Sequence, residues 1–308
     1  MKPQRVSVLL NASSGKIDGE ARDQLREALQ SAFEKHGTSA SLEFLPGEDL
    51  RSGAERALER VTRGELDAVI IGGGDGSIRT MASVLAGSGV ALGIIPLGTL
   101  NHFAKDLKIP ISVDEAATII AAGETRSVDV GEVNGRIFIN NSSIGIYPYL
   151  VLDRERQRRR KGLPKWPAMI LAGLRAFRHF PLRRLSIRAE GWAEPCRSPC
   201  VFVGNNEYRL TGASLGSRAK VNDGKLCLYI AKQQSLGSLF WLACRCVVGL
   251  LDQARDLRIL SLPAVEISSH HRRLLVAFDG EIESLQSPLH YRIKPGALRV
   301  FAPSASDA

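Results

Sequence analysis

Short apolar runs alternate with amphipathic stripes through the first 125 residues, and this alternation constrains the fold more than any other feature. The apolar runs are residues 6–10, 41–45, 67–71 and 91–95, and stripes at helical spacing cover residues 21–33 and 50–61. Such alternation builds a parallel sheet with helices on both faces. Because ligands of these sheets bind at the carboxyl ends of the strands, the segments that follow the first, third and fourth runs form the candidate site.

A glycine-rich loop, Gly72-Gly-Gly-Asp-Gly-Ser77, follows the third run and precedes a predicted helix. Glycines allow positive φ and a close backbone approach, and successive N–H groups at a helix start attract anions. Four glycines in five residues exceed what a tight turn needs, so the loop predicts phosphate binding. A carboxylate beside phosphates would be repelled, so Asp75 is predicted to bind Mg²⁺ that bridges it to them.

Two further polar loops follow the fourth and first runs. The segment Pro96–Ala104 offers a close backbone approach at Gly98, the hydroxyl of Thr99 and the amide of Asn101; alternatively, Thr99 is only a helix N-cap. Asn11-Ala-Ser-Ser-Gly15 is the third loop. The sequence matches neither a P-loop nor the dinucleotide fingerprint, so the expected nucleotide site is of another kind.

Length and charge agree with a two-domain protein that has an anionic partner. The chain has 308 residues, a net charge of +9 and a pI of about 9.5. No secretory signal is predicted, and the apolar stretch 236–251 is interrupted by Arg245 and shorter than the roughly 20 residues of a membrane span. The five cysteines form no CxxC pair, which indicates reduced thiols, not a metal site, and a cytoplasmic location.

The second half of the chain reads as a β-rich domain. Short strand-like runs bounded by turns occupy residues 136–140, 185–189, 200–203, 226–230, 264–268 and 274–278. Residues 289–293 and 298–301 are expected to form a last pair of strands around Pro295-Gly296.

A basic segment, Arg154–Arg188, contains twelve Arg or Lys and one Glu, together with Trp166, Phe177 and Phe180. Basic residues interleaved with aromatic ones suit an anionic bilayer surface, which predicts peripheral membrane association. Nucleic-acid binding and a plain solvated helix face are the alternatives, and no nucleic acid is expected.

These motifs together resemble the catalytic domain of the diacylglycerol kinase family, which includes bacterial lipid kinases, sphingosine kinases and ceramide kinase. The resemblance begins with Gly73–Ser77 and Pro96–Ala104, and the glycine loop is shared with NAD kinases and 6-phosphofructokinases. Further matching segments follow the family's order: Asn11–Gly15, Val128–Val130, Asn222–Leu226 and Phe278–Glu281.

The resemblance implies an ATP-dependent kinase of lipid metabolism and phospholipid biosynthesis, with Mg²⁺ and a lipid hydroxyl as acceptor. It implies an α/β domain with a parallel sheet (residues 1–128), a β-sandwich (129–293), a C-terminal segment (about 294–308) that returns to the first domain, and the nucleotide in the cleft between them. Glu281 would be the general base, assisted by Asp75, and Asp75, Asp129 and Asp223 would bind metal. ATP would contact Asn11, Ser13, Ser14, Gly15, Gly73, Gly74, Asp75, Gly76, Ser77, Gly98, Thr99 and Asn101.

The sequence departs from the family pattern at three positions. Ser77 replaces the usual Thr, Arg79 the usual Asn, and His102 the usual Asp, so one carboxylate of the family's metal network is missing. Two alternatives therefore stay open: a kinase for a soluble substrate such as NAD, and a nucleotide-binding regulatory protein without turnover. The sequence identifies neither the acceptor lipid nor the oligomeric state.

Overall fold

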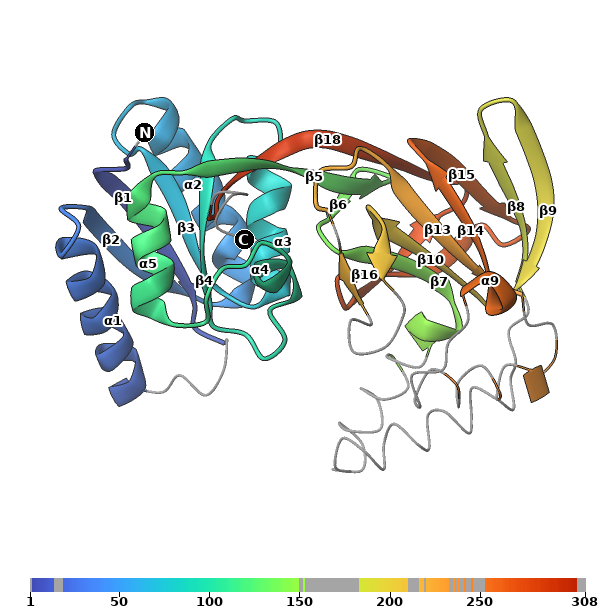
Figure 1. Cartoon of the computed structure of the whole chain (residues 1–308), viewed down its shortest axis with the longest axis horizontal. Helices are drawn as coiled ribbons and strands as arrows, with labels where there is room; N and C mark the ends of the chain where they lie inside the picture. Colours follow the sequence, from blue (N-terminus) through green and yellow to red (C-terminus); the bar gives the residue numbers. More distant parts are fainter. Residues whose placement is uncertain are drawn as a thin grey trace. The chain divides into compact units, whose positions relative to one another are not determined.

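Four parallel strands separated by helices begin the chain, as the alternating pattern predicts (Figure 1). The computed structural model describes residues 2–13, 19–149, 152, 183–209, 216–218, 220–232, 235, 237–238, 241, 245 and 253–303. Its first elements are β1 (Arg5–Asn11), α1 (Gly19–Glu34), β2 (Ser39–Leu45), a 3₁₀ turn (Gly47–Asp49), α2 (Leu50–Thr62), β3 (Ala68–Gly73), α3 (Asp75–Leu85), β4 (Ala91–Pro96), α4 (His102–Asp106) and α5 (Val113–Ala122).

The strand order β2-β1-β3-β4 brings the carboxyl ends of β1, β3 and β4 to one edge of the sheet. Every residue of β3 and β4 is buried, which explains their uniformly apolar runs. Just before β3, Asp67 accepts hydrogen bonds from the main-chain N–H groups of Gln4 and Arg5, both at 2.8 Å. Burial alone would raise the pKa of Asp67, but these bonds and the Arg5 guanidinium outweigh it and lower the pKa.

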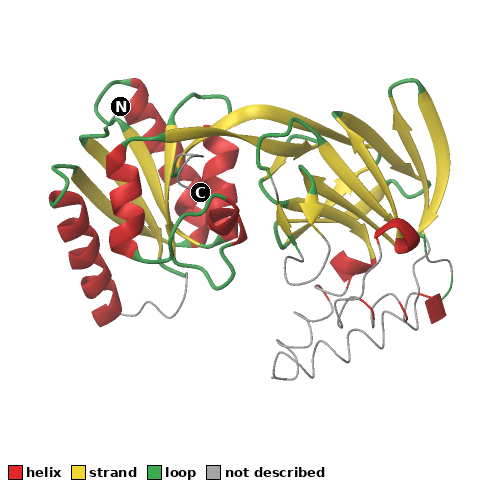
Figure 2. Ribbon diagram, in the orientation of Figure 1, coloured by secondary structure: helices red, strands yellow, loops and turns green. Residues whose placement is uncertain are grey.

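Helices cover both faces of this sheet (Figure 2). α1 packs against α5, and α2 packs against α3. The buried side chains of α1 are Leu29, Ala32 and Phe33. Ala28, which the sequence placed on the apolar stripe, is exposed because it lies one helical position to the side of the buried row.

The later residues form two antiparallel sheets that enclose a shared core, the β-sandwich that the resemblance implies. One sheet has the strand order β14-β13-β10-β7-β16-β17, and the other contains β15-β8-β9 beside β18. Buried side chains from both sheets, such as Val203, Ile267 and Phe278, make up the core. The elements are β5 (Thr125–Val133), β6 (Arg136–Phe138), β7 (Asn141–Gly145), β8 (Arg183–Ala189), β9 (Trp192–Ser198), β10 (Cys200–Asn205), β11 (Tyr208–Arg209), β12 (Ser217–Arg218), β13 (Leu226–Ala231), α9 (Gln253–Asp256), β14 (Leu257–Leu262), β15 (Ala264–Ser269), β16 (Arg273–Phe278), β17 (Glu281–Gln286) and β18 (Leu289–Phe301).

The expected pair of strands around Pro295-Gly296 is wrong, because β18 is one strand of 13 residues. Its first half pairs with β15 in antiparallel register, and its second half pairs with β4 in parallel register at Arg299 and Val300. The two halves therefore have different partners and never fold back on each other.

The chain divides into two compact units. The first comprises residues 1–130, 220–222 and 294–308, and the second comprises residues 131–219 and 223–293. Among the helices that the structure describes, none combines the length and the apolar character needed to cross a membrane. Most of the basic segment (residues 154–182) and most of the apolar stretch 236–251 lie outside the described residues.

Candidate functional site

The loops after β1 and β3 are joined by a side-chain hydrogen bond. Asn11, the last residue of β1, donates through Nδ2 to Oγ of Ser77 at 2.8 Å, and its Oδ1 accepts from the main-chain N–H of Ser13 at 2.9 Å. Ser77 lies in the first turn of α3 and is 5% exposed. Ser14 and Gly15, which the sequence predicts as nucleotide contacts, lie outside the described residues.

The loops after β3 and β4 touch through their backbones. A Cβ atom placed on Gly98 would lie 2.5 Å from Cα of Gly74, and the main-chain N–H of Leu97 donates to the carbonyl of Gly73 at 3.1 Å. Side chains at either glycine would push the two loops apart. Part of the glycine content of this region therefore serves the contact between loops, a role that the sequence analysis did not anticipate.

Asn101 shapes the loop that follows β4. It is 2% exposed and adopts the left-handed conformation with φ of 51°. Its Oδ1 accepts from the main-chain N–H of Gly98 at 3.0 Å, and its Nδ2 donates to the Gly98 carbonyl at 2.8 Å. Asn101 is also the N-cap of α4, so the alternative that Thr99 is this cap is wrong; Thr99 is exposed in the same loop.

Asp75 links the glycine loop to α4. Its two carboxylate oxygens accept hydrogen bonds from the main-chain N–H groups of His102 at 3.1 Å and Phe103 at 2.9 Å. These are the first N–H groups of a helix, which have no acceptor within the helix. Asp75 therefore has a structural role that needs neither phosphate nor metal, and metal binding by Asp75 stays a prediction.

The N-terminus of α3 has the features of an anion site. Its N-cap is Gly74, which has no side chain to accept from the first N–H groups, and its first intrahelical bond runs from Ile78 to Gly74 at 3.0 Å. The helix is 11 residues long, so its dipole adds positive potential at this end. The loops after β1, β3 and β4 all meet around this terminus, as the sequence predicts.

The predicted metal ligand Asp129 is buried within the first unit, at 1% exposed. Its Oδ1 accepts from the main-chain N–H of Gly296 at 2.8 Å, and its own N–H donates to the Val221 carbonyl at 2.9 Å. Asp129 therefore fixes β18 beside β5. Within the described ranges, no three His, Cys, Asp or Glu side chains gather into a metal cage.

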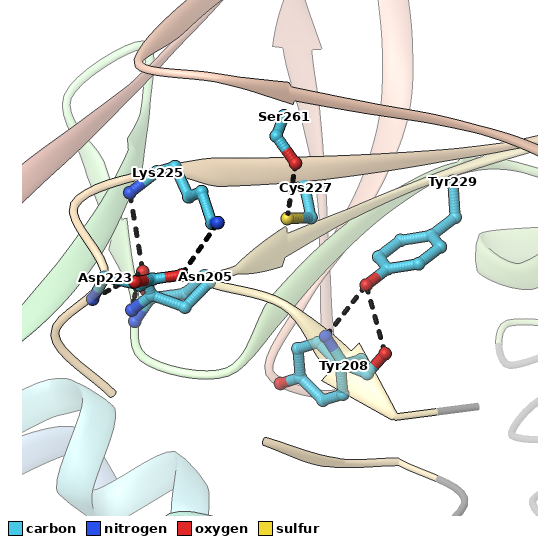
Figure 3. A network of polar contacts seen from close by, with 8 residues as sticks. Asn205, Tyr208, Asp223, Lys225, Cys227, Tyr229 and Ser261 are labelled. Atoms are coloured by element: carbon cyan, nitrogen blue, oxygen red, sulfur yellow. Dashed lines mark hydrogen bonds and ion pairs between the residues drawn. The ribbon is translucent and has the colours of Figure 1, made fainter. Parts of the chain in front are cut away.

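The predicted metal ligand Asp223 belongs to the second unit and pairs with an ammonium group (Figure 3). Nζ of Lys225 lies 2.8 Å from its carboxylate, and this contact raises the pKa of Lys225. The buried residue Asn206 accepts the main-chain N–H groups of Asp223 at 3.1 Å and Lys225 at 3.4 Å. Lys225 thus supplies positive charge where the resemblance expects a structural metal ion.

Glu281 begins β17, directly after a tight turn in which Asp279 and Gly280 both have positive φ. The carboxylate of Asp279 accepts three hydrogen bonds from main-chain N–H groups, those of Ile139 and Asn140 at 2.8 Å and that of Asn141 at 3.2 Å. These bonds fix the main chain of the turn that precedes Glu281, whose side chain is exposed.

A buried polar network supports this turn, and the sequence analysis missed it. Arg218, 7% exposed, donates to the carbonyl of Ile139 at 2.7 Å and to Oδ1 of Asn140 at 3.1 Å. Asn205 donates to the same Ile139 carbonyl at 2.8 Å. The only signal in the sequence was polar residues beside apolar strand runs, which does not identify their partners.

The comparisons with known proteins agree with this architecture. Residues 5–133 match the family model described as "Diacylglycerol kinase catalytic domain", and residues 154–302 match "YegS C-terminal NAD kinase beta sandwich-like domain". A "Probable lipid kinase YegS-like" from Pseudomonas aeruginosa is 31% identical over 261 residues, 82% of each chain. A "Probable lipid kinase YegS" from Salmonella arizonae is 28% identical over 260 residues, 82% of this chain and 84% of the relative.

Solved structures agree on the fold. The crystal structure of a diacylglycerol kinase from Bacillus anthracis has a TM-score of 0.68 at 20% identity and covers 99% of both chains. Sequence relatives, domain models and fold thus coincide over most of the chain. The chain belongs to the diacylglycerol kinase catalytic-domain family of kinases, among its YegS-like members.

Proposed function

We propose that this protein is an ATP-dependent lipid kinase that phosphorylates a hydroxyl of diacylglycerol or a related lipid. The observation that carries the proposal is the meeting of three loops around the N-terminus of α3, tied by the Asn11–Ser77 bond and the Gly74–Gly98 contact. Such a terminus is suited to a polyphosphate. The names of the relatives, which are lipid kinases, support a lipid acceptor.

In this proposal the main-chain N–H groups of residues 73–77 hold the triphosphate, and the exposed hydroxyl of Thr99 adds a donor. Asn11 and Asn101 hold the loops in shape, since their amides are engaged within the loops. Ser13, Ser14 and Gly15 complete the predicted set.

The described residues would bind Mg²⁺ only together with the nucleotide, because they form no cage of three metal-binding side chains. Asp75 would hold the ion with one carboxylate oxygen in addition to its hydrogen bonds to α4, and phosphate oxygens would supply further ligands. When bound, Mg²⁺ neutralises phosphate charge. Asp129 and Asp223 belong to different units. Asp129 accepts a hydrogen bond from Gly296 and Asp223 pairs with Lys225, and metal binding by either residue stays a prediction.

Glu281 is proposed as the general base. Its carboxylate accepts the proton of the attacking hydroxyl while that oxygen bonds to the γ-phosphorus and the bond to the leaving ADP oxygen breaks. The hydrogen bonds of Asp279 fix the main chain of the turn beside Glu281, and a fixed main chain suits a residue that acts as a catalytic base.

The test is incubation of the purified protein with ATP, Mg²⁺ and either diacylglycerol in mixed micelles or NAD. A phosphorylated lipid supports the proposal. Phosphorylated NAD would support a kinase for soluble substrates, and tight ATP binding without any product would support a regulatory protein.

Peripheral membrane docking is part of the same proposal. The residues that suggest it are mostly outside the described part of the chain, and the net charge of +9 agrees with it. Sedimentation with liposomes of anionic or neutral lipid tests it, and failure to bind anionic liposomes at low salt would remove it.

A further inference from the structure

A cavity of about 380 Å³ opens in the second unit, on strands β8, β9 and β15. Its polar lining in the described residues consists of two guanidinium groups, three hydroxyls and one imidazole, and contains no carboxylate: Arg184, Arg197, Ser186, Ser268, Ser269 and His270. A lining with this composition attracts anions. None of these residues belongs to the site proposed for phosphoryl transfer.

The two arginines are placed against each other by the strand register. Arg184 of β8 lies directly opposite Arg197 of β9. Directly opposed residues have Cβ atoms about 4.5–5.5 Å apart on the same face, and like charges there repel. In the empty protein this pair therefore opposes the pairing of β8 with β9.

Neighbouring arginines differ because each has an acidic partner. Arg188, on the same strand as Arg184, pairs with Glu266 at 3.5 Å, and Arg258 pairs with Glu194. Among the residues that the structure describes, neither Arg184 nor Arg197 is within ion-pair distance of a carboxylate. Within the described part of the chain, these two exposed cations of the cavity lining therefore have no carboxylate partner.

The hydroxyls complete a set of donors. Ser268 of β15 lies opposite Ser186 of β8, and His270, one residue beyond the end of β15, also lines the cavity. Guanidinium groups bind phosphate oxygens in pairs, and serine hydroxyls donate to the remaining oxygens. We propose that this cavity binds a phosphate monoester dianion, either free in solution or as the headgroup of a lipid, and that binding relieves the Arg184–Arg197 repulsion.

The test combines calorimetry with vesicle binding. Inorganic phosphate is the soluble probe, and vesicles of phosphatidylcholine with or without phosphatidic acid are the lipid probe. The test variant is R184Q/R197Q, and the matched control is Arg188→Gln, which removes one cation from the same strand where a carboxylate neutralises it.

We expect the double variant to lose about tenfold or more in affinity, while Arg188→Gln stays within about twofold of the wild type. Arginine-dependent binding of inorganic phosphate identifies a soluble ligand; arginine-dependent binding only to phosphatidic acid vesicles identifies a headgroup. Equal losses in the double variant and the control, or no loss in either arm, overturn the proposal.

A ligand-free measurement provides a second readout. At low salt, Arg197→Gln should raise the urea midpoint of the empty protein, because the repulsion disappears, and phosphate should stabilise the wild type more than this variant. A lower urea midpoint for Arg197→Gln without ligand contradicts the proposal, because the arginines would then stabilise the empty fold.

Discussion

The structural role of Asp75 and its predicted metal role can be separated by measuring stability in the absence of any ligand. Asp75→Ala removes both acceptors of the first N–H groups of α4. Phe103 is fully buried, so water cannot readily replace the acceptor of its N–H, whereas water can do so at the exposed His102. Hydrogen bonds to charged groups contribute about 1.5–3 kcal/mol, and exposed ones less, so we expect a loss of about 2–3 kcal/mol.

Asp75→Asn should lose about half as much, because its one remaining oxygen can still accept from Phe103. The assay is urea unfolding in EDTA, followed by circular dichroism, with the exposed Asp23→Asn as a control of equal charge change in the same unit. The control should stay within about 0.5 kcal/mol of the wild type.

The outcome that refutes the reasoning is a specific one. If Asp75→Ala unfolds like the wild type in EDTA but no longer binds ATP with Mg²⁺, the carboxylate acts through the metal alone. If stability falls equally with and without magnesium and nucleotide, the link between the glycine loop and α4 accounts for the effect.

Glu281→Gln should abolish turnover and keep ATP affinity, because an amide cannot take the proton, while the control Glu283→Gln on the same strand should stay active. Initial rates measure turnover and calorimetry measures ATP affinity. An active Glu281→Gln variant would reject Glu281 as the general base. Gly98→Ala should destabilise the protein by about 1–3 kcal/mol in urea and weaken ATP binding, because its Cβ would overlap the neighbouring loop; unchanged values would contradict the close contact. The lowered pKa of Asp67 means that its stabilising effect is present above about pH 4 and is lost as pH falls through the folded pKa. Asp67→Asn should therefore be less stable than the wild type in urea at pH 7, and the two proteins should converge near pH 2. A difference in stability that does not depend on pH would contradict this. Lys225→Met should make the melting temperature rise more with added Mg²⁺ than it does in the wild type, because the Asp223 carboxylate loses the ammonium group that competes with the ion; an equal rise in both proteins would contradict this.

The parallel sheet and the edge at which its loops meet were predictable because their causes are local. Uniform burial of β3 and β4 requires uninterrupted apolar runs, and glycines at a strand's carboxyl end are visible in the sequence itself. The expected strands at residues 6–10, 67–71 and 91–95 consequently match β1, β3 and β4 to within about two residues at each end.

The roles of individual polar residues were less predictable because they depend on distant partners. Asp75 reads as a metal ligand beside phosphates, and its bonds to a helix that starts at residue 102 appear only in the fold. Arg218 likewise shows no motif, because its acceptors lie near residue 140.

The strand β18 shows how a strong local signal can mislead. Pro295-Gly296 is typical of a turn, and Gly296 does have a φ of 59°. Its N–H is bound by Asp129, however, and the chain continues in the same direction to a second partner strand. The chain stays extended at Pro295-Gly296 because partner strands are available on both sides, although the two residues themselves favour a turn.

The course of β18 also affects how the protein can be made in a cell. Ala91 and Leu92 of β4 can pair only with Arg299 and Val300 on this edge, and those two residues are synthesised much later. Until then the apolar edge of β4 remains open to any other strand, and such edges are where nascent chains aggregate. The sheet of the first unit is therefore complete only after residues 299 and 300 have been translated, so the order of synthesis delays the closing of this edge.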